Sequence, residues 1–368
     1  MKKIVFLVPS MSYGGAERVI SILSNEWVKL GYEVAIISMD KEKRAVYPLN
    51  DKIRLKFVDE AHLRTPSDCV RLIKRVRKEL LMEKPDIVLS FINSTAAFAC
   101  LALRGTGIPV IFSERNDPYS NINGWKAKLF QRIALHDAAH IVFQTEGARA
   151  YYKAKIRDKS SIILNPIEIK SNIGTENRRK EKKIVSVGRL CAQKNQKLLI
   201  DAFEMVQKNH PEYKLEIYGE GELRTELEEQ IKCAGLSDFV ILPGVKQNVF
   251  DYINAAAVFV FSSDYEGLPN ALIEAMALGM PCVSTDCSPG GAREIIQNYE
   301  NGILVPCGDK EKMAVAINFL LDNKEEAEKM GKEARKIRER LDAEKIAKRW
   351  ITLLDEVAGG KANESKNK

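Results

Sequence analysis

Residues 258–276 read VFVFSSDYEGLPNALIEAM, and this segment gives the clearest indication of the fold. It opens on four apolar residues, which match the length and composition of a buried strand. A polar loop follows, and Pro269 fits the first turn of the helix that comes next. A strand that leads through a short loop into a helix is the repeating unit of a parallel sheet with helices on its faces. The segment therefore predicts an α/β fold.

The same strand-to-helix unit recurs along the chain. In the first half, apolar runs that alternate with helical patterns occupy residues 4–8, 34–38, 87–91, 110–113, 141–144 and 162–164. In the second half they occupy residues 184–187, 215–218, 240–242, 258–261, 282–284 and 303–305. Each series predicts its own doubly wound parallel sheet. Two domains also suit a chain of 368 residues, because single cores stop growing at roughly 250–300 residues.

A charged stretch, KSNIGTENRRKEKK, separates the two series and marks the domain boundary. We predict an N-terminal domain of residues 1–169, a linker of residues 170–183 and a C-terminal domain of residues 184–342. A further helix is expected over residues 343–357. The tail of residues 358–368 is too polar to pack against a core and is expected to be disordered.

Composition and charge narrow the class of protein. Seven cysteines form an odd set without a C-x-x-C pair, which favours a reduced, cytosolic protein. No stretch approaches the ~20 apolar residues of a membrane span, so membrane association would be peripheral. The net charge is +7, and residues 1–160 hold 27 Lys and Arg against 17 Asp and Glu. This basic first half predicts an anionic partner, such as nucleic acid, anionic lipid or a phosphorylated acceptor.

Gly14 and Gly15 follow the first strand and open a helix at Ala16, where backbone amides can approach a phosphate. A structural tight turn explains such a pair equally well. The full G-x-G-x-x-G fingerprint is absent here, which argues against a nicotinamide-dinucleotide enzyme.

Two cations follow the first strand of the second series. Gly188 and Arg189 come directly after that strand, and Lys194 lies five residues further on, at the start of a helix. Ligands of doubly wound sheets bind at the carboxyl ends of the strands. The planar fork of Arg189 and the point charge of Lys194 would neutralise a diphosphate there. A solvated basic loop is the alternative.

The loop after residue 261 and the helix that follows carry two glutamates. The amides of residues 267–271 lie at a helix N-terminus and would bind an anion. Glu266 lies outside the helix, where it would accept hydrogen bonds from sugar hydroxyls, and Glu274 would reach a ribose. Glutamates in a helical segment are usually solvated, but the apolar neighbours of Glu274 make an idle carboxylate costly there.

Three of these motifs together resemble the family 4 retaining glycosyltransferases: the early Gly pair, GRL-x3-K at residues 188–194 and E-G-L-P-x4-E at residues 266–274. SPGGAREII at residues 288–296 resembles the same family, notably members that extend polyprenyl-diphosphate-linked oligosaccharides or build capsule and O-antigen chains. The resemblance covers essentially the whole chain. It implies the GT-B fold, in which two Rossmann-like, doubly wound domains face each other across a cleft. It also implies that the last helix crosses back onto the first domain.

The resemblance implies a role for each matching residue. Glu266, Arg189 and Lys194 would form the catalytic set, in which the two cations hold the nucleotide diphosphate and the glutamate holds the donor sugar. Glu274 would hold the ribose. The other donor-binding residues that it implies are Gly14, Gly15, Gly188, Val245, Gly267, Leu268, Pro269 and Asn270. In the family's usual account the leaving phosphate helps to deprotonate the acceptor, without a protein nucleophile or a bound metal. We therefore expect no metal and no cofactor, and we expect a UDP-sugar as co-substrate.

One position departs from the family's pattern. Many members have a histidine after a strand of the first domain, where it contacts the donor sugar, whereas this chain has SERND at residues 113–117. Glu114 or Arg115 would take over that contact.

Basic residues follow helical spacing in VRLIKRVRKELL, residues 70–81. Arg71, Lys74, Arg75 and Lys78 would share a face that suits an anionic membrane surface or a diphosphate acceptor. No aromatic residues are interleaved with them, which argues against nucleic acid as the partner. An ordinary solvated helix face is the alternative.

Two other patterns have more than one explanation. GWKAKLFQRIAL at residues 124–135 combines Trp125 and Phe130 with lysines, which suits a membrane interface or, for Phe130, core packing. His136 and His140 have the spacing of a zinc pair, but no glutamate follows the first histidine, so a helix-end pair is favoured.

The sequence as a whole predicts an enzyme that moves a hexose or N-acetylhexosamine from a UDP-sugar to a polyprenyl-diphosphate-linked glycan, with retention of configuration. We expect it in the cytoplasm, peripherally bound to the inner face of the cell membrane. The alternative is a catalytically silent GT-B protein that binds a nucleotide sugar or an anionic partner. The spaced glutamate pair argues against a third possibility, a nucleotide-sugar epimerase.

Overall fold

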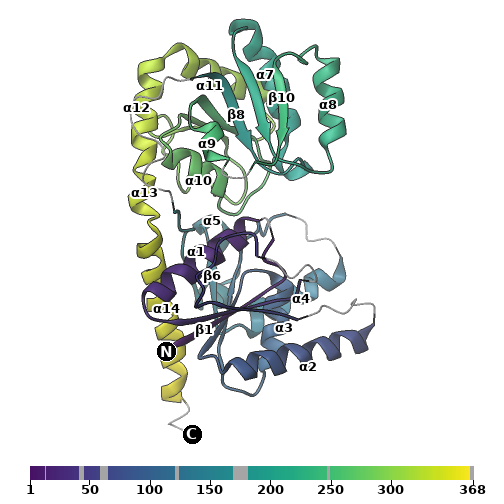
Figure 1. Cartoon of the computed structure of the whole chain (residues 1–368), viewed down its shortest axis with the longest axis vertical. Coiled ribbons are helices and arrows are strands. Elements are labelled where there is room, and N and C mark those ends of the chain that lie inside the picture. Colours follow the sequence, from purple (N-terminus) through teal and green to yellow (C-terminus); the bar gives the residue numbers. More distant parts are fainter. Residues whose placement is uncertain are drawn as a thin grey trace. The chain divides into compact units, whose positions relative to one another are not determined.

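The computed structural model divides into two compact units (Figure 1). Unit 1 comprises Met1–Glu168 and Leu341–Lys368, and unit 2 comprises Ile169–Arg340. The structure describes residues 1–12, 14–40, 45–58, 65–120, 124–168, 181–246 and 249–364. Each unit holds one parallel sheet, as the repeated strand-to-helix pattern predicts.

Unit 1 is built on a seven-stranded sheet with the order β3-β2-β1-β4-β5-β6-β7. Every neighbouring pair is parallel. The strands are β1 Lys3–Val8, β2 Glu33–Ser38, β3 Arg54–Phe57, β4 Ile87–Ser90, β5 Val110–Ser113, β6 His140–Phe143 and β7 Ser160–Ile162. The order reverses between β1 and β4, and in doubly wound sheets ligands bind at the carboxyl ends of the strands near such a reversal.

The helices of unit 1 are α1 Gly15–Lys29, α2 Pro66–Glu83, α3 Asn93–Leu103, α4 Trp125–Asp137, α5 Glu146–Ala150, α6 Ala154–Arg157 and α14 Ala343–Glu364. Thr65 and Asp68 form a capping box that fixes the start of α2. Leu72, Val76 and Leu80 lie one turn apart and are buried in the core of the unit. α3 packs between α2 and α4, so these three helices form one layer.

The last helix, α14, packs beside α1 within unit 1 (Figure 1). The indole Nε1 of Trp27 on α1 donates a hydrogen bond to the carbonyl of Ala347, at 3.1 Å. The ring of Trp350 is fully buried, 6.5 Å from that of Trp27 and 5.8 Å from that of Phe91 between centroids. Large aromatic rings contribute much of the apolar area in a core, so these contacts attach α14 to unit 1.

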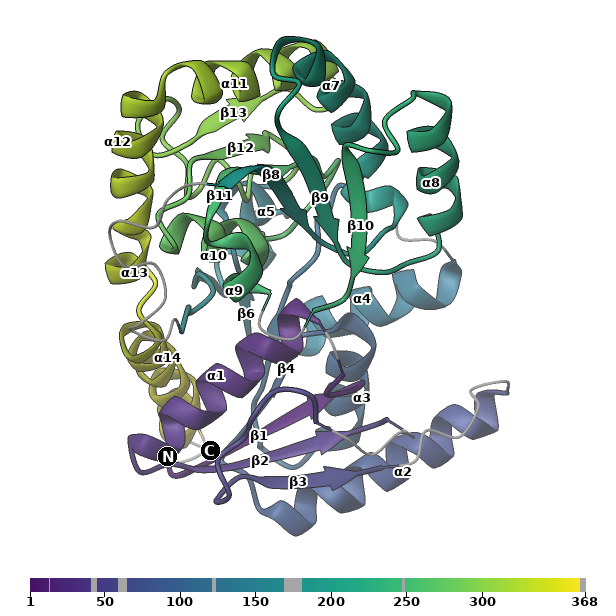
Figure 2. The same cartoon turned by 45° about the horizontal axis from the view of Figure 1, so that its top comes forward.

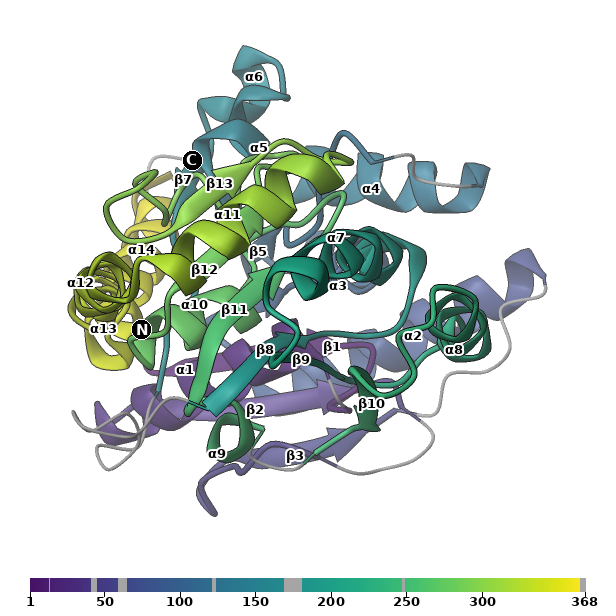
Figure 3. The same ribbon diagram turned by 90° about the horizontal axis from the view of Figure 1, so that it is seen from above.

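Unit 2 has a six-stranded parallel sheet with the order β10-β9-β8-β11-β12-β13 (Figure 2). Its strands are β8 Glu181–Val187, β9 Lys214–Tyr218, β10 Val240–Gly244, β11 Ala256–Phe261, β12 Cys282–Thr285 and β13 Ile303–Val305. Its helices are the 3-10 turn Ala192–Lys194, α7 Gln196–Asn209, α8 Arg224–Cys233, α9 Phe250–Ile253, α10 Asn270–Ala277, α11 Lys310–Asp322, α12 Lys324–Arg335 and α13 Ile337–Arg340. α7 and α11 lie side by side over one face of the sheet (Figure 3).

The predicted linker is wrong at its end, because β8 already begins at Glu181. Residues 181–183 are charged, which made them resemble a linker. In the structure the ammonium of Lys183 pairs with the carboxylates of Glu181, at 2.8 Å, and Glu216, at 3.5 Å. These pairs accommodate charge at the start of a strand. Residues 170–180 of the predicted linker lie outside the described residues.

The last helix starts at Ala343 as predicted, whereas the domain boundary before it and the end of the helix differ from the prediction. Asp342 belongs to unit 1 rather than to the C-terminal domain, since it forms a β-bridge with Ile167. α14 continues to Glu364, so the prediction of disorder is wrong for residues 358–364. Once a helix is nucleated, each further residue adds one hydrogen bond and the helix extends readily. Residues 365–368 lie outside the described residues.

Candidate donor site and acceptor surface

The predicted donor-binding residues of unit 2 gather at the carboxyl ends of β8 and β11. These two strands are parallel neighbours, so the loops that follow them meet at one edge of the sheet. The loop after β8 carries Gly188, Arg189 and Lys194, and the loop after β11 carries Glu266. The fold therefore brings together residues that are more than 70 positions apart in the sequence.

Lys194 and Glu266 form an ion pair at this edge. The ammonium of Lys194 donates to Oε1 of Glu266, and the hydroxyl of Ser263 donates to the same oxygen at 3.0 Å. Glu266 is 8% exposed, and the ammonium also lies 5.0 Å from the centre of the Phe261 ring. The cation and the hydroxyl together hold this carboxylate in place.

Gly188 and Arg189 complete the loop after β8. A Cβ at Gly188 would lie 3.4 Å from the stem of Lys194, which is an ordinary van der Waals distance, so the stem passes directly over the glycine. The side-chain Nε2 of Gln196 donates to the backbone carbonyl of Arg189 at 2.7 Å and fixes the backbone there. The Arg189 side chain is exposed and makes no hydrogen bond or ion pair to other described residues. Its guanidinium is thus available for an anion.

The residues after Glu266 lead directly into α10. Pro269 is the N-cap of this helix rather than a member of its first turn, and Asn270 is the first helical residue. Leu268 is buried, and Glu274 lies on the buried part of α10 with 8% exposure. Gly267 and Asn270 therefore lie between the two glutamates, where the helix N-terminus places its amides.

Val245 lies just beyond β10, at the same carboxyl edge of unit 2, and is 58% exposed. The carbonyl of Gly244 accepts a hydrogen bond from the amide of Gly219 at 3.1 Å, which connects the loops after β10 and β9. Residues 247–248 beyond it lie outside the described residues.

In unit 1, the Gly pair lies where β1 ends and α1 begins. Gly14 is the N-cap with extended backbone, and α1 starts at Gly15, one residue before the predicted start. A Cβ at Gly14 would lie 2.0 Å from Oε2 of Glu17. That atom is the end of a flexible side chain, so the contact is adjustable. Tyr13, which precedes the pair, lies outside the described residues.

Glu114 and Arg115 follow β5, and their side chains contact different residues. Glu114 is 3% exposed and accepts hydrogen bonds from the amide of Asn116, at 3.2 Å, and the hydroxyl of Tyr152, at 3.5 Å. Burial outweighs these bonds and raises the pKa of Glu114 to about 7. The guanidinium of Arg115 donates to Oδ1 of Asn165 and lies 3.8 Å from the centre of the Phe91 ring.

The Arg115 side chain is held inside unit 1. Its Nε and Nη2 atoms are inaccessible to solvent and have no hydrogen-bond partner among the described residues. The guanidinium also lies 6.0 Å from the Trp350 ring of α14. Attraction to the aromatic faces offsets part of the cost of burying the cation. In this structure the Arg115 guanidinium packs on aromatic rings, and the contact of Glu114 or Arg115 with the donor sugar stays a prediction.

The predicted basic face of α2 lies at the surface. The charged members, Arg71, Lys74, Arg75 and Lys78, are all exposed. Three apolar side chains on the same helix are exposed as well: Val70 by 52%, Leu81 by 38% and Met82 by 58%. On α4, Trp125 is 72% exposed, whereas the Phe130 ring packs 5.1 Å from Phe98 at the core. Basic and apolar groups thus share the outer surface of this helix layer.

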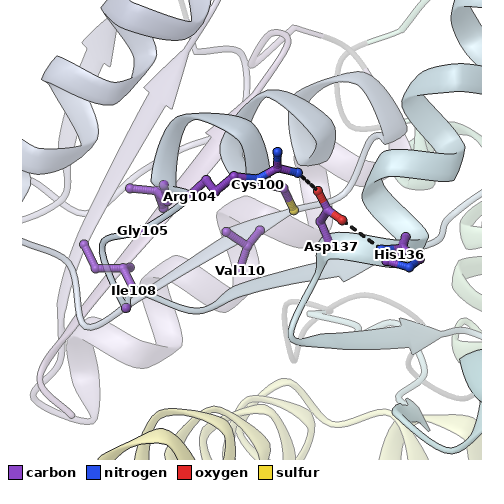
Figure 4. A pocket seen from close by; sticks show the side chains of 9 residues that line it. Cys100, Arg104, Gly105, Ile108, Val110, His136 and Asp137 are labelled. Carbon is purple, nitrogen blue, oxygen red and sulfur yellow. Dashed lines mark hydrogen bonds and ion pairs between the residues drawn. The ribbon is translucent and has the colours of Figure 1, made fainter. Parts of the chain in front are cut away.

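The remaining motifs do not form a site. His136 contacts Asp137, and His140 contacts Ser161, so the histidines do not converge on one point. The pocket in Figure 4, of about 340 Å³, lies at the start of β5, where Asp137 also pairs with Arg104. That is the edge of the sheet opposite to the carboxyl ends, where no predicted site residue lies. Among the described residues, no group of three or more His, Cys, Asp and Glu is placed to hold a metal.

Comparisons with known proteins agree with this geometry. A sequence profile described as Glycosyltransferase Family 4 matches residues 13–171, and one described as Glycosyl transferases group 1 matches residues 169–337. An uncharacterised glycosyltransferase of Methanocaldococcus jannaschii is 30% identical over 290 residues, which cover 66% of this chain and 70% of that protein. The chain belongs to the family 4 glycosyltransferases.

A further relative and a solved structure are also similar to this glycosyltransferase. A Campylobacter jejuni protein named GalNAc-alpha-(1->4)-GalNAc-alpha-(1->3)-diNAcBac-PP-undecaprenol alpha-1,4-N-acetyl-D-galactosaminyltransferase is 28% identical over 366 residues, covering 97% of this chain and 99% of that protein. The crystal structure of Anabaena HepE in complex with UDP and glucose matches with a TM-score of 0.82 at 16% identity, over 97% of this chain and all of that chain. The structural likeness establishes the GT-B fold of the glycosyltransferase.

Three glycines of the glycosyltransferase pack closely against the loops of the predicted donor site, although no role was predicted for them. A Cβ at Gly291 would lie 1.8 Å from the carbonyl oxygen of Gly267, so the SPGG segment must be glycine there to pack against the donor loop. Gly219 and Gly221 make equally close approaches to the carbonyls of Gly188 and Leu190. The SPGG motif indicated that Gly291 matters, but the local sequence could not show that Gly291 packs against the loop of Gly267.

No described helix of the glycosyltransferase combines the length and the apolar composition needed to cross a bilayer.

Proposed function

We propose that this glycosyltransferase moves a hexose or an N-acetylhexosamine from a UDP-sugar onto a polyprenyl-diphosphate-linked glycan, with retention of configuration and without a bound metal. The observation that carries the proposal is the convergence of Lys194 and Glu266 at the carboxyl edge of unit 2, in the loops that also hold the exposed Arg189. A buried carboxylate at this edge is suited to accept hydrogen bonds from sugar hydroxyls. The two cations suit a diphosphate.

The proposed chemistry uses these residues to bind and position the donor. Arg189 and Lys194 offset the negative charge that grows on the UDP as the bond from sugar carbon C1 to the phosphate oxygen breaks. The acceptor hydroxyl bonds to C1 on the same face, and its proton passes to the departing phosphate. Glu266 orients the sugar, and Glu274 binds the ribose. Retention follows because the acceptor approaches from the side that the phosphate leaves.

Two observations support the proposed acceptor: the exposed surface of unit 1 and the names of relatives. The C. jejuni relative is named for an undecaprenol-diphosphate-linked substrate. The exposed cations of α2, together with Val70 and Met82, suit a diphosphate at an anionic bilayer surface. We therefore place the enzyme in the cytoplasm, bound peripherally to the inner face of the cell membrane, with no nucleic acid as partner.

The test is the release of UDP from a panel of UDP-sugars, with and without a mixture of polyprenyl-diphosphate-linked glycans, each measured with and without EDTA. We expect release that depends on one donor and on the lipid-linked acceptor. The anomeric configuration of the product, measured by NMR, should match that of the donor. Binding of a UDP-sugar without any transfer would instead indicate the catalytically silent alternative, and loss of activity in EDTA would contradict metal independence.

A further inference from the structure

Two cysteines lie side by side at the carboxyl edge of unit 2. β12 and β13 are parallel partners in which Thr285 pairs with Val305. Cys287 and Cys307 each lie two residues beyond that pair, so the register brings them next to each other. The amide of Asp286 donates to the carbonyl of Val305 at 2.8 Å, which continues the ladder past the last paired residues. Neighbouring strands are about 4.8 Å apart, within the range of Cα separations that disulfides span.

The two thiols interact directly. A hydrogen bond between them, together with burial, raises the pKa of Cys287, and the same bond lowers the pKa of Cys307. Cys287 is 2% exposed, whereas Cys307 is exposed at the surface. The pair therefore consists of one accessible thiol whose pKa is lowered and one buried thiol beside it. Accessibility and thiolate character are what an oxidant selects.

We propose that Cys287 and Cys307 form a redox modification site, which a peroxide converts reversibly into a disulfide. The thiolate of Cys307 attacks the peroxide O–O bond and becomes a sulfenic acid, with release of hydroxide. Cys287 then attacks the Cys307 sulfur, so that the S–S bond forms and water leaves. In sum, two thiols and one hydrogen peroxide give one disulfide and two waters. A small dithiol such as dithiothreitol reverses the modification by thiol–disulfide exchange.

The disulfide would form in contact with both segments that hold Glu266. The sulfur of Cys307 lies 3.9 Å from the carbonyl oxygen of Ser263, whose hydroxyl donates to the Glu266 carboxylate. Cys287 precedes Ser288, whose carbonyl accepts a hydrogen bond from the Glu266 amide at 2.9 Å. A bond between the two sulfurs would tie these two segments together beside Glu266, and we expect it to disturb the position of that carboxylate. The effect on transfer rests on the proposed function, whereas formation of the disulfide does not.

The first measurement is chemical. The full-length protein is treated with hydrogen peroxide, denatured, alkylated with iodoacetamide and mapped by mass spectrometry. We expect two fewer alkylated cysteines and a peptide pair that links Cys287 to Cys307, both reversed by dithiothreitol. Cys307→Ser should remove the linked peptide. Cys233→Ser, at another exposed cysteine, should leave it in place. An oxidised wild type in which Cys307 is alkylated, or carries a sulfinic acid without the link, overturns the proposal.

The second measurement is UDP release by the oxidised and the reduced enzyme. We expect oxidation to lower transfer several-fold, dithiothreitol to restore it, and the Cys307→Ser variant to be insensitive to peroxide. Cys287→Ala tests the same point in case one variant folds poorly. If no donor supports transfer, the proposed function fails while the linked peptide still decides the modification site. If the link forms and transfer is unchanged, the coupling to Glu266 is wrong.

Discussion

Each unit carries a buried glutamate just after a strand, and the two glutamates have different partners. Glu266 in unit 2 accepts from the ammonium of Lys194 and the hydroxyl of Ser263. Glu114 in unit 1 accepts from an amide and a phenol, both neutral, and burial raises its pKa to about 7. Arg115 is adjacent in sequence but stacks on Phe91 instead. Two glutamates at similar positions in the two folds therefore have different surroundings, because the neighbouring donors differ.

The largest expected effect follows from removal of the unit 2 carboxylate. Glu266→Ala should abolish transfer, a loss of about 10³-fold or more, because the donor sugar loses its hydrogen-bond acceptor and Lys194 loses its partner. UDP release measures the rate, and circular dichroism and thermal unfolding check the fold. Glu300→Ala, at an exposed glutamate, is the matched control and should retain activity. Near-normal turnover of the Glu266 variant with a confirmed donor would refute the assigned role.

Removal of the cation should have the next largest effect. Lys194→Ala should lower transfer by about 10²-fold, because one charge that offsets the growing negative charge on UDP is lost. Lys197→Ala removes the same charge from a nearby exposed pair with Glu226, and exposed pairs contribute little. Steady-state kinetics compare the two variants. Equal, small losses in both would mean that Lys194 acts only through net charge.

The buried carboxyl of Glu114 in unit 1 should make the free energy of unfolding depend on pH. The folded pKa of Glu114, about 7, lies above the ordinary value of 4.5, so the folded state retains a proton that the unfolded chain gives up. Stability from this group is present below pH 4.5 and falls as pH rises to 7, by on the order of 3 kcal/mol. Glu114→Gln should remove that decline. Urea unfolding of both proteins at pH 5 and pH 7.5 measures it, and identical pH dependences would show that Glu114 is ionised in the folded state.

The strands and the donor loops were predictable because their signals are local. Buried parallel strands are continuous apolar runs, and the motifs around Lys194 and Glu266 follow two such runs. β3 was not predicted because Arg54 and Lys56 interrupt its apolar pattern. In the structure Arg54 and Lys56 both form ion pairs with Glu83. Burial alone would raise the pKa of this carboxyl, but hydrogen bonds from lysines outweigh burial and lower the pKa of Glu83 to about 2. Such compensation between distant segments cannot be read from either segment alone.

The features of the site that the sequence could not predict are likewise contacts between residues far apart in the chain. The hydrogen bond from Ser263 and the ion pair of Lys194 with Glu266 require the relative placement of β8 and β11, which only the folded sheet supplies. The inward orientation of Arg115 depends on Phe91 and on Trp350 of α14, more than 200 residues away. A charged residue after a strand predicts a site, but the packing of other elements decides which way it points.

The smallest expected effect concerns the surface of unit 1, where charge is exposed rather than buried. Lys74 and Lys78 have exposed side chains and no ion pair among the described residues, so they are free to meet anionic lipid. Each basic residue near such a surface contributes about 1 kcal/mol, so Lys74→Gln with Lys78→Gln should weaken vesicle binding by roughly 10- to 30-fold. Co-sedimentation with vesicles containing phosphatidylglycerol measures this at low salt. The matched control, Lys329→Gln with Lys332→Gln on α12 of unit 2, removes the same net charge. Equal losses in the two double variants would indicate general charge attraction, whereas a loss confined to α2 identifies its basic face as the membrane contact.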